Sequence, residues 1–242
     1  MTHAGTTAPS APPNLLARAF GVIFSPRETY ASIVRRPKVL GAMLAVVVII
    51  AGVQYAFLST EIGQRAMVDQ NIDMMESFGV TISDQQLANM ERGASRGAIF
   101  AVISIFVFVP VVQMIMAGLV LVVFNAVLGG EAGFKQVLAI VVHGGFIGAL
   151  QVLFVTPLNY LNESMASATS LAVFLPMLDA TSFIGRLAGS IDFFRIWSTV
   201  SLAIGLGVLY KRRTSPIAWS LLAVYFVIII VIAGVRAALS GA

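Results

Sequence analysis

The stretch LGGEAGFKQVLAIVVHGG, residues 128–145, combines residue types that could build a phosphate loop and a general base. Its glycines and Lys135 could surround a phosphate, and His143 could accept a proton. Phosphate loops follow patterns such as G-x-G-x-x-G or G-x-x-x-x-G-K-[ST], and this stretch matches neither. Glu131 would also repel a phosphate. The glycines are therefore predicted to end one helix and to turn the chain tightly into the next.

Few other residues could support catalysis or metal binding. The chain has no cysteine, which excludes thiolate nucleophiles and thiolate zinc sites. Its two histidines are His143 and His3, which lies in a Pro- and Ala-rich tail, so a histidine-based metal site is not expected. Ser95 lies in a G-x-S-x-G match, Gly93–Gly97, but this match falls in a predicted helix and not at the strand-to-helix turn that such a nucleophile needs. The sequence predicts that the protein is not an enzyme and uses no cofactor.

The composition indicates a membrane protein. Of 242 residues, 58% are hydrophobic and 11% are charged, and the mean hydropathy is +0.93. Soluble domains have about 25% charged residues, so this chain cannot bury its apolar residues in one soluble core. The net charge of +4 is too small to suggest nucleic-acid binding. We predict an all-α, polytopic membrane protein.

Five apolar segments are predicted to span the membrane as helices. The second contains Pro110, but the part before this proline is too short to cross about 30 Å of hydrocarbon, so one long helix, with a kink allowed at the proline, is expected. The five spans are 39–58, 98–128, 134–155, 193–210 and 217–235.

The segment 167–186 is apolar but is not predicted to span. A central Asp179 costs about 3 kcal/mol in a bilayer, and Pro176 interrupts the run. We expect short interfacial or re-entrant helices within a wider segment, 162–190.

The distribution of charge predicts the orientation. With five spans and a cytoplasmic N-terminus, nine of the 15 basic residues and two of the 11 acidic residues lie on the cytoplasmic side. This agrees with the positive-inside rule and places the C-terminus outside. A sixth span at 167–186 would move the basic run 211–213 outside, against the rule.

The remaining segments lie outside the bilayer. Residues 1–13 are expected to be a disordered tail, and 14–38 two amphipathic cytoplasmic helices, the second started by Ser25-Pro26 with Glu28 completing a capping box. A helical connection, 59–97, with a second capping box at Ser83–Gln86, lies on the outer side, and the membrane domain as a whole covers 39–236. Side chains of 14–38 expected at the membrane interface or against a protein partner are Phe20, Tyr30, Arg35, Arg36 and Lys38.

Polar side chains recur on the third predicted span. Gln136, His143 and Gln151 fall on one arc of this helix together with Gly144 and Gly148. The glycines have G-x-x-x-G spacing, which allows close contact with another helix. This arc is a candidate packing surface or polar site.

The second predicted span carries a matching set of residues. Gln113 and Asn125 share one side of it with the small residue Ala117. The two spans could simply pack together, with a neutral His143 bonded to a neighbouring amide or carbonyl. They could instead enclose a polar pathway or a proton-linked site. Packing is favoured, since no Asp or Glu within the spans is available to His143.

An acidic residue at the mouth of the fourth span is expected to be structural. Asp192 and Arg195 are three residues apart, and Trp197 follows them. An interfacial ion pair with an aromatic anchor is predicted.

Four segments resemble a known family in their order and spacing. Phe24-Ser25-Pro26-x-x-Thr29-Tyr30 with Pro37, and the stretch 128–144, are similar to motifs of bacterial members of the Ypt-interacting-protein (YIP) domain family. The segments TSLAVFL, 169–175, and IDFFRIWSTVSLAIGLG, 191–207, resemble its later segments. The resemblance covers about 15–235. It implies five spans and no established enzymatic activity.

The resemblance bears on the partners as well. Eukaryotic members act in vesicle traffic through Rab-type GTPases, but this chain lacks their long acidic cytoplasmic domain. We therefore expect a non-enzymatic, multi-pass protein of a bacterial cytoplasmic membrane that organises the membrane or recruits partners there. The expected contacts are the lipid bilayer and a possible protein partner at the N-terminal helices. The alternative is a small transporter, channel or lipid translocator using the polar surface between spans two and three.

Overall fold

The structure, a computed structural model, describes residues 14–240, and no strand occurs within that range. Four helices are long and apolar enough to cross a membrane: α3 (Leu40–Leu58), α5 (Asp84–Leu121) with its π-helical extension η1 (Val122–Val127), α6 (Phe134–Leu161) and α9 (Thr214–Ser240). The expected fourth span is the apolar helix α8 (Phe193–Leu209), which has 17 residues and is shorter than the others. The all-helical membrane fold is confirmed, and the count of five spans stays a prediction.

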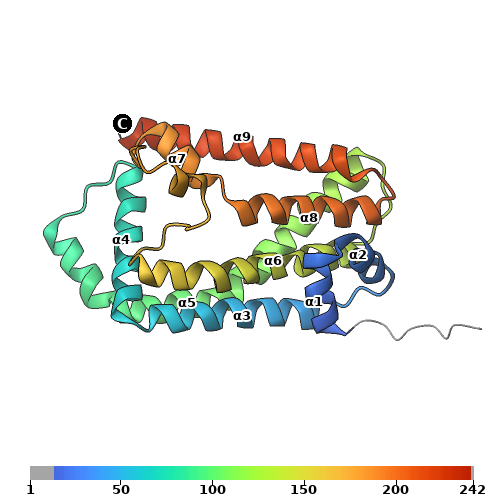
Figure 1. The fold of residues 1–242 in the computed structure, drawn as a ribbon, viewed down its shortest axis with the longest axis horizontal. Coiled ribbons are helices and arrows are strands. Elements are labelled where there is room, and N and C mark those ends of the chain that lie inside the picture. The colour runs from blue at the N-terminus through green and yellow to red at the C-terminus, as the bar shows by residue number, and fades with distance from the viewer. Residues whose placement is uncertain (1–13, 241–242) are drawn as a thin grey trace, which may run out of the picture.

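Helix α6 is the central helix of the bundle. In its most apolar 18-residue window 50% of the residues are buried, compared with 17% in the corresponding windows of α5 and α9. Helices α3, α6, α8 and α9 run roughly along one axis, with α3 on one side of α6 and with α8 and α9 on the other, and α5 crosses α6 obliquely (Figure 1). Residues on the outside of such a bundle contact lipid, which explains why so many large apolar side chains are exposed.

Shorter helices close the two ends of the bundle. Helices α1 (Leu15–Phe24) and α2 (Pro26–Arg35) lie at one end, where α1 runs crosswise to α3 and α6 (Figure 1). Helix α4 (Glu61–Ser77), the 3-10 turn η2 (Leu171–Phe174) and α7 (Phe183–Ser190) lie at the other end. Neither η2, with 4 residues, nor α7, with 8, is long enough to span, and the interfacial or re-entrant position of 162–190 stays a prediction.

Helices α2 and α5 begin where the capping residues predicted that they would begin. Ser83 and Gln86 form the predicted capping box, and α5 then continues from the connection 59–97 through Pro110. Ser25 precedes α2 with Pro26 at its first turn, but its side chain caps nothing, so the capping box predicted with Glu28 is wrong. The Ser25 carbonyl instead accepts a hydrogen bond from Thr29 Oγ1 at 2.9 Å.

The glycine-rich stretch forms the predicted reversal between α5 and α6. The π-helical turn ends at Val127, and Gly129, two residues later, has a φ of 68°, in the left-handed region that favours glycine. A Cβ on Gly130 would lie 2.5 Å from the Tyr210 ring and 2.8 Å from the Phe124 carbonyl. Gly129 is therefore required by the turn, and Gly130 by the close approach of Tyr210 and Phe124.

Candidate functional site

Helix α1 presents an apolar row away from the bundle. Leu16, Phe20 and Phe24 are spaced four residues apart and are 69%, 62% and 77% exposed. The side of α1 that faces the bundle holds Val22 and the charged Arg18, both buried. An amphipathic helix in water would have the opposite arrangement, so the environment outside α1 must be apolar.

Arg18 fastens α1 to the chain that precedes the first span. It is 3% exposed, and its Nη1 donates to the Arg36 carbonyl at 3.3 Å. Burial, and then the nearby charge of Arg36, lower the pKa of the Arg18 guanidinium. The helix is thus held in a fixed position with its apolar row outward.

Tyr30 is not at the membrane interface, so that part of the prediction is wrong. It is completely buried, and its hydroxyl bonds Ser201 Oγ of α8 at 2.8 Å. Burial raises the pKa of the Tyr30 phenol. The ring reaches two glycines, because a Cβ on Gly144 would lie 3.3 Å from its hydroxyl and one on Gly205 would lie 3.2 Å from the ring. Helix α2 therefore packs between α6 and α8 and is not available as a whole to lipid or to a partner.

Basic residues at the end of α2 and just after it are exposed, namely Arg35, Arg36 and Lys38. Their place at the membrane interface or against a partner stays a prediction. Together with the apolar row of α1 they form one surface at this end of the bundle, which we call the N-terminal surface. It consists of Leu16, Phe20, Phe24, Arg35, Arg36 and Lys38.

His143 is packed within the bundle. It is 0% exposed, and Nδ1 lies 2.7 Å from the Ala139 carbonyl of its own helix. A neutral imidazole that donates from Nδ1 presents Nε2 as an acceptor. Nε2 of His143 and Nε of Arg18 are both buried without a partner, and Arg18 is near enough for its charge to act on the imidazole. The one hydrogen bond that the structure gives the imidazole is the bond to its own helix, so the contacts of His143 are those of a packed core residue.

The polar residues predicted on spans two and three do not gather into one site. Gln113 of α5 is 8% exposed, and its amide nitrogen lies against Gly145 of α6. Gln136 and Gln151 turn elsewhere: Gln136 Nε2 donates to the Val34 carbonyl of α2 at 3.4 Å, and Gln151 Nε2 donates to Asp192 at 3.0 Å. The predicted arc of α6 thus faces α2 and α8, and the expectation of a polar surface between the second and third spans is wrong.

The predicted G-x-x-x-G contact is also corrected. Gly144 faces Tyr30 of α2, and a Cβ on Gly148 would meet no atom within 4 Å. Gly145 makes the close approach, since its Cβ would lie 2.9 Å from Gln113 and 3.3 Å from Val46. Ala117 of α5 is fully buried in the main core.

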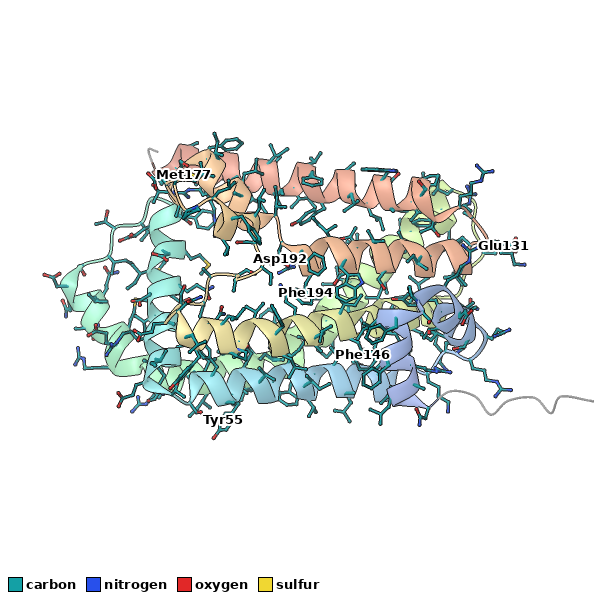
Figure 2. The ribbon with its side chains drawn as sticks, in the orientation of Figure 1. Tyr55, Glu131, Phe146, Met177, Asp192 and Phe194 are labelled. Atoms are coloured by element: carbon teal, nitrogen blue, oxygen red, sulfur yellow. The ribbon has the colours of Figure 1, made fainter. Side chains whose placement is uncertain are left out.

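Asn125 and Gln136 hold the reversal between α5 and α6. Asn125 Nδ2 donates to the Ala132 carbonyl at 2.8 Å, and its Oδ1 accepts from the Tyr210 hydroxyl at 2.9 Å. Gln136 Oε1 accepts from the Gly133 amide at 3.1 Å. These side chains fix a turn at one end of the bundle, where Figure 2 shows Glu131.

Asp192 accepts more hydrogen bonds than the sequence analysis predicted. It lies before α8 and is 4% exposed (Figure 2). Arg195 contributes its backbone amide at 3.1 Å and not the ion pair that was predicted. The other donors to the carboxylate are Gln151 at 3.0 Å, Ser167 at 2.5 Å and Thr169 at 2.6 Å.

These bonds decide the ionisation of Asp192. Burial alone would raise the pKa of its carboxyl, but hydrogen bonds from Ser167, Thr169 and two backbone amides outweigh burial and lower the pKa. Its backbone pairs with that of Ser170, and Tyr225 of α9 approaches its amide. Asp192 thus links the segment 167–170 to α6, α8 and α9. The signal for this role was the run of hydroxyl residues at 167–170.

A mixed-charge cavity of about 780 Å³ lies at the end of the bundle opposite α1. Asp73 and Glu76 of α4 line it together with Arg186 of α7 and Arg236 of α9. Arg186 bonds Ser240 at 2.8 Å. Between residues 14 and 240, no three or more histidine, cysteine, aspartate or glutamate side chains come close enough to hold a metal ion.

Comparisons with known proteins agree with the fold and the motifs. The model of the Yip1 domain matches residues 20–235. Membrane protein YknW of Bacillus subtilis (strain 168) is 28% identical over 196 residues, which cover 77% of this chain and 76% of that protein. No solved structure matches the chain. The chain therefore belongs to the Yip1 domain family.

Proposed function

We propose that this Yip1-domain membrane protein is not an enzyme and that its N-terminal surface organises a bacterial cytoplasmic membrane or recruits partners to it. The observation that carries the proposal is the outward row Leu16, Phe20 and Phe24 on a helix that lies crosswise to the spans. Burying an apolar side chain of this size is worth about 1.5–3 kcal/mol. For three side chains that are about two-thirds exposed, transfer into lipid gives about 3–6 kcal/mol.

The proposed topology has five spans, with α1 on the cytoplasmic side and the end of α9 outside. Helix α8 is the fourth of these spans in chain order, although it is only about 25 Å long at 1.5 Å per residue. Its buried residues include Ser201, Ala203 and Leu206, so it lies among the spanning helices. The segment tied to Asp192 fills the space beyond its outer end.

Single cysteines test the position of α1, because the natural chain has none. A cysteine in place of Phe20, labelled with a fluorophore in reconstituted vesicles, is expected to be quenched by spin-labelled lipid. A cysteine in place of the exposed Arg35 is the matched control and is expected to be quenched by a water-soluble agent. A label at position 20 that is as accessible to water as the label at position 35 contradicts the proposal.

The same approach tests the topology. Cysteines in place of Glu131, in the cytoplasmic reversal, and Glu91, in the outer connection, are exposed. In intact cells, a membrane-impermeant maleimide is expected to label position 91 and not position 131. Labelling from the same side is incompatible with the proposed arrangement.

Recruitment is tested with a photo-crosslinking residue at position 20. We expect it to capture lipid or a specific protein, and the same residue at the exposed position 131, outside the N-terminal surface, serves as the control. Transport between α5 and α6 has no comparable support, because Gln136 and Gln151 turn to α2 and α8. Flux of ions, lipids or small solutes in reconstituted vesicles that is abolished by Gln113→Ala would favour transport instead.

A further inference from the structure

A basic pocket of about 700 Å³ lies between α2 and the turn that joins α8 to α9. Arg27 of α2 lines one side, and Lys211, Arg212 and Arg213 of the turn line the other. All four are exposed. The rest of the lining contains no acidic side chain: Ala31, Gly207, Val208, Thr214 and Ser215. We call it the basic pocket.

The pocket is rimmed by a rigid turn. The Arg212 amide donates to the Gly207 carbonyl at 2.9 Å, and its Nη2 donates to the Leu128 carbonyl at 3.0 Å. A Cβ on Gly207 would lie 2.9 Å from Thr214 Oγ1, so the start of α9 lies directly on α8. The positions of residues 212–214 are therefore set without a ligand.

Helix ends add to the positive potential of the basic pocket. Thr214 and Ser215 are the first residues of the 27-residue helix α9, whose first N–H groups have no partner within the helix. Arg213 directly precedes this helix, and Arg27 lies in the first turn of α2. Cations are unfavourable at a helix N-terminus. Glu28 also lies in the first turn of α2 but does not line the pocket, so the lining itself, with the start of α9, has an excess of positive charge.

The positive-inside rule accounts for only part of this arrangement. It explains basic residues on this side of the membrane, and Lys211 also lies favourably at the C-terminus of α8. It does not require a concave site or hydroxyls of Thr214 and Ser215 beside the cations. Lys211 has a φ of 53°, at the position after a helix where glycine is most common. A lysine with this backbone conformation keeps a charge at the pocket.

We propose that the basic pocket binds a phosphate group, carried either by the headgroup of an anionic lipid or by a soluble phosphate compound. Guanidinium groups bind phosphate oxygens through charge-assisted hydrogen bonds, and helix N-termini add backbone donors. This proposal rests on the proposed function, whose topology places the pocket on the cytoplasmic side of the membrane, and it adds the chemical class of the ligand.

The test measures binding to the purified full-length protein in a neutral detergent. One series adds short-chain phosphatidic acid, a second adds phosphatidylcholine, and a third adds inorganic phosphate before phosphatidic acid. Bound lipid is counted by native mass spectrometry. The pocket variant is Arg27→Gln with Arg213→Gln. The control is Arg92→Gln with Arg96→Gln, which removes the same charge from exposed positions outside the pocket and outside the N-terminal surface.

We expect the wild type to bind phosphatidic acid at least about tenfold more tightly than phosphatidylcholine. The pocket variant is expected to lose at least about tenfold in affinity for phosphatidic acid beyond any loss in the control. Competition by millimolar inorganic phosphate identifies a soluble phosphate as a sufficient ligand, and lack of competition identifies the lipid headgroup. Both results support the proposal.

Two results would overturn the proposal. One is an equal loss of affinity in the two variants, which indicates diffuse charge attraction only. The other is the absence, in the wild type, of a preference for phosphatidic acid over phosphatidylcholine. This comparison does not depend on the folding of any variant. Binding in detergent does not depend on the position of α1, so failure here leaves the cysteine test of the N-terminal surface unaffected.

Discussion

Replacing Asp192 with asparagine is expected to release the outer segment 162–190 from the bundle. The carboxylate accepts bonds on both oxygens: Gln151 and the Arg195 amide bind Oδ1, while Ser167 and Thr169 bind Oδ2. Asparagine keeps one acceptor oxygen and replaces the other with a donor. The bonds from Ser167 and Thr169, the two shortest, are therefore the ones that are lost.

The expected cost follows from these two bonds. A hydrogen bond to a charged group contributes about 1.5–3 kcal/mol, and two bonds in one network do not add fully. The two hydroxyls can also rotate to accept bonds from the new amide. We therefore expect the free energy of unfolding of Asp192→Asn to fall by about 2–4 kcal/mol. Reversible unfolding in mixed detergent micelles measures this change.

Local protection separates the anchor from a general loss of stability. In hydrogen exchange, amides of 167–175 are expected to lose protection in Asp192→Asn while those at the centre of α6 keep theirs. Ser167→Ala, which removes one donor to the same oxygen, should give a smaller change in the same segment. Wild-type stability together with unchanged protection of 167–175 would refute this role for Asp192.

The pH dependence has a definite sign. The pKa of Asp192 in the folded protein is below its ordinary value of 3.8. A carboxyl with a lowered folded-state pKa stabilises the protein fully above its ordinary pKa and loses this contribution as the pH falls toward the folded-state value. The hydrogen-exchange protection of amides 167–175 should therefore not change with pH near neutrality. It should fall below about pH 3.8, as Asp192 is protonated and the segment is released.

Two further predictions concern the contacts of α8 with its neighbours. Gly205→Ala places a Cβ 2.4 Å from Ile140 Cγ2 and should destabilise the protein by about 1–3 kcal/mol. The control Gly148→Ala places its Cβ where no atom lies within 4 Å, and it should be neutral or stabilise the protein by up to about 1 kcal/mol. Equal melting temperatures for the two variants would contradict this packing. Tyr30→Phe leaves Ser201 Oγ without its 2.8 Å partner and should cost about 1–3 kcal/mol. Adding Ser201→Ala should recover part of that cost in a double-mutant cycle, and strictly additive losses would argue against the bond.

The sequence predicted local features well because their causes are local. Gly129 ends a helix through its own φ, and Ser83 caps one through a residue three positions later. Helix ends beyond the bilayer were harder to place. Helix α6 continues to Leu161 through Pro157, and α9 covers 214–240 and not 217–235. Hydropathy marks where the hydrocarbon ends, but a helix is free to continue into the interface.

The sequence could not predict which helix lies against each face. Periodicity correctly placed Gln136, His143 and Gln151 on one arc of α6, but it contains no information about the neighbour. The assumption that consecutive spans share their polar surfaces pointed to α5, and the structure places α2 and α8 there. Tyr30 was assigned to the interface because it lies on the apolar side of an amphipathic helix that ends in basic residues. Its helix carries charge at both ends, and its burial depends on glycines about 115 and 175 positions further along the chain.

The burial of Tyr30 bears directly on how the N-terminal surface can act. Helices in a bilayer gain little hydrophobic free energy from contacting one another, so close approach at small residues and satisfied polar groups must hold them together. Here α2 supplies both, through the contact of Tyr30 with Gly144 and Gly205 and through its bond to Ser201. Moving α2 out of the bundle would leave a buried hydroxyl unpaired and a gap between α6 and α8. Helix α1, joined to α2 at Ser25 and fixed by Arg18, must therefore act as a rigid part of the membrane domain, so a lipid or partner bound at Phe20 acts directly on the packing of the spans.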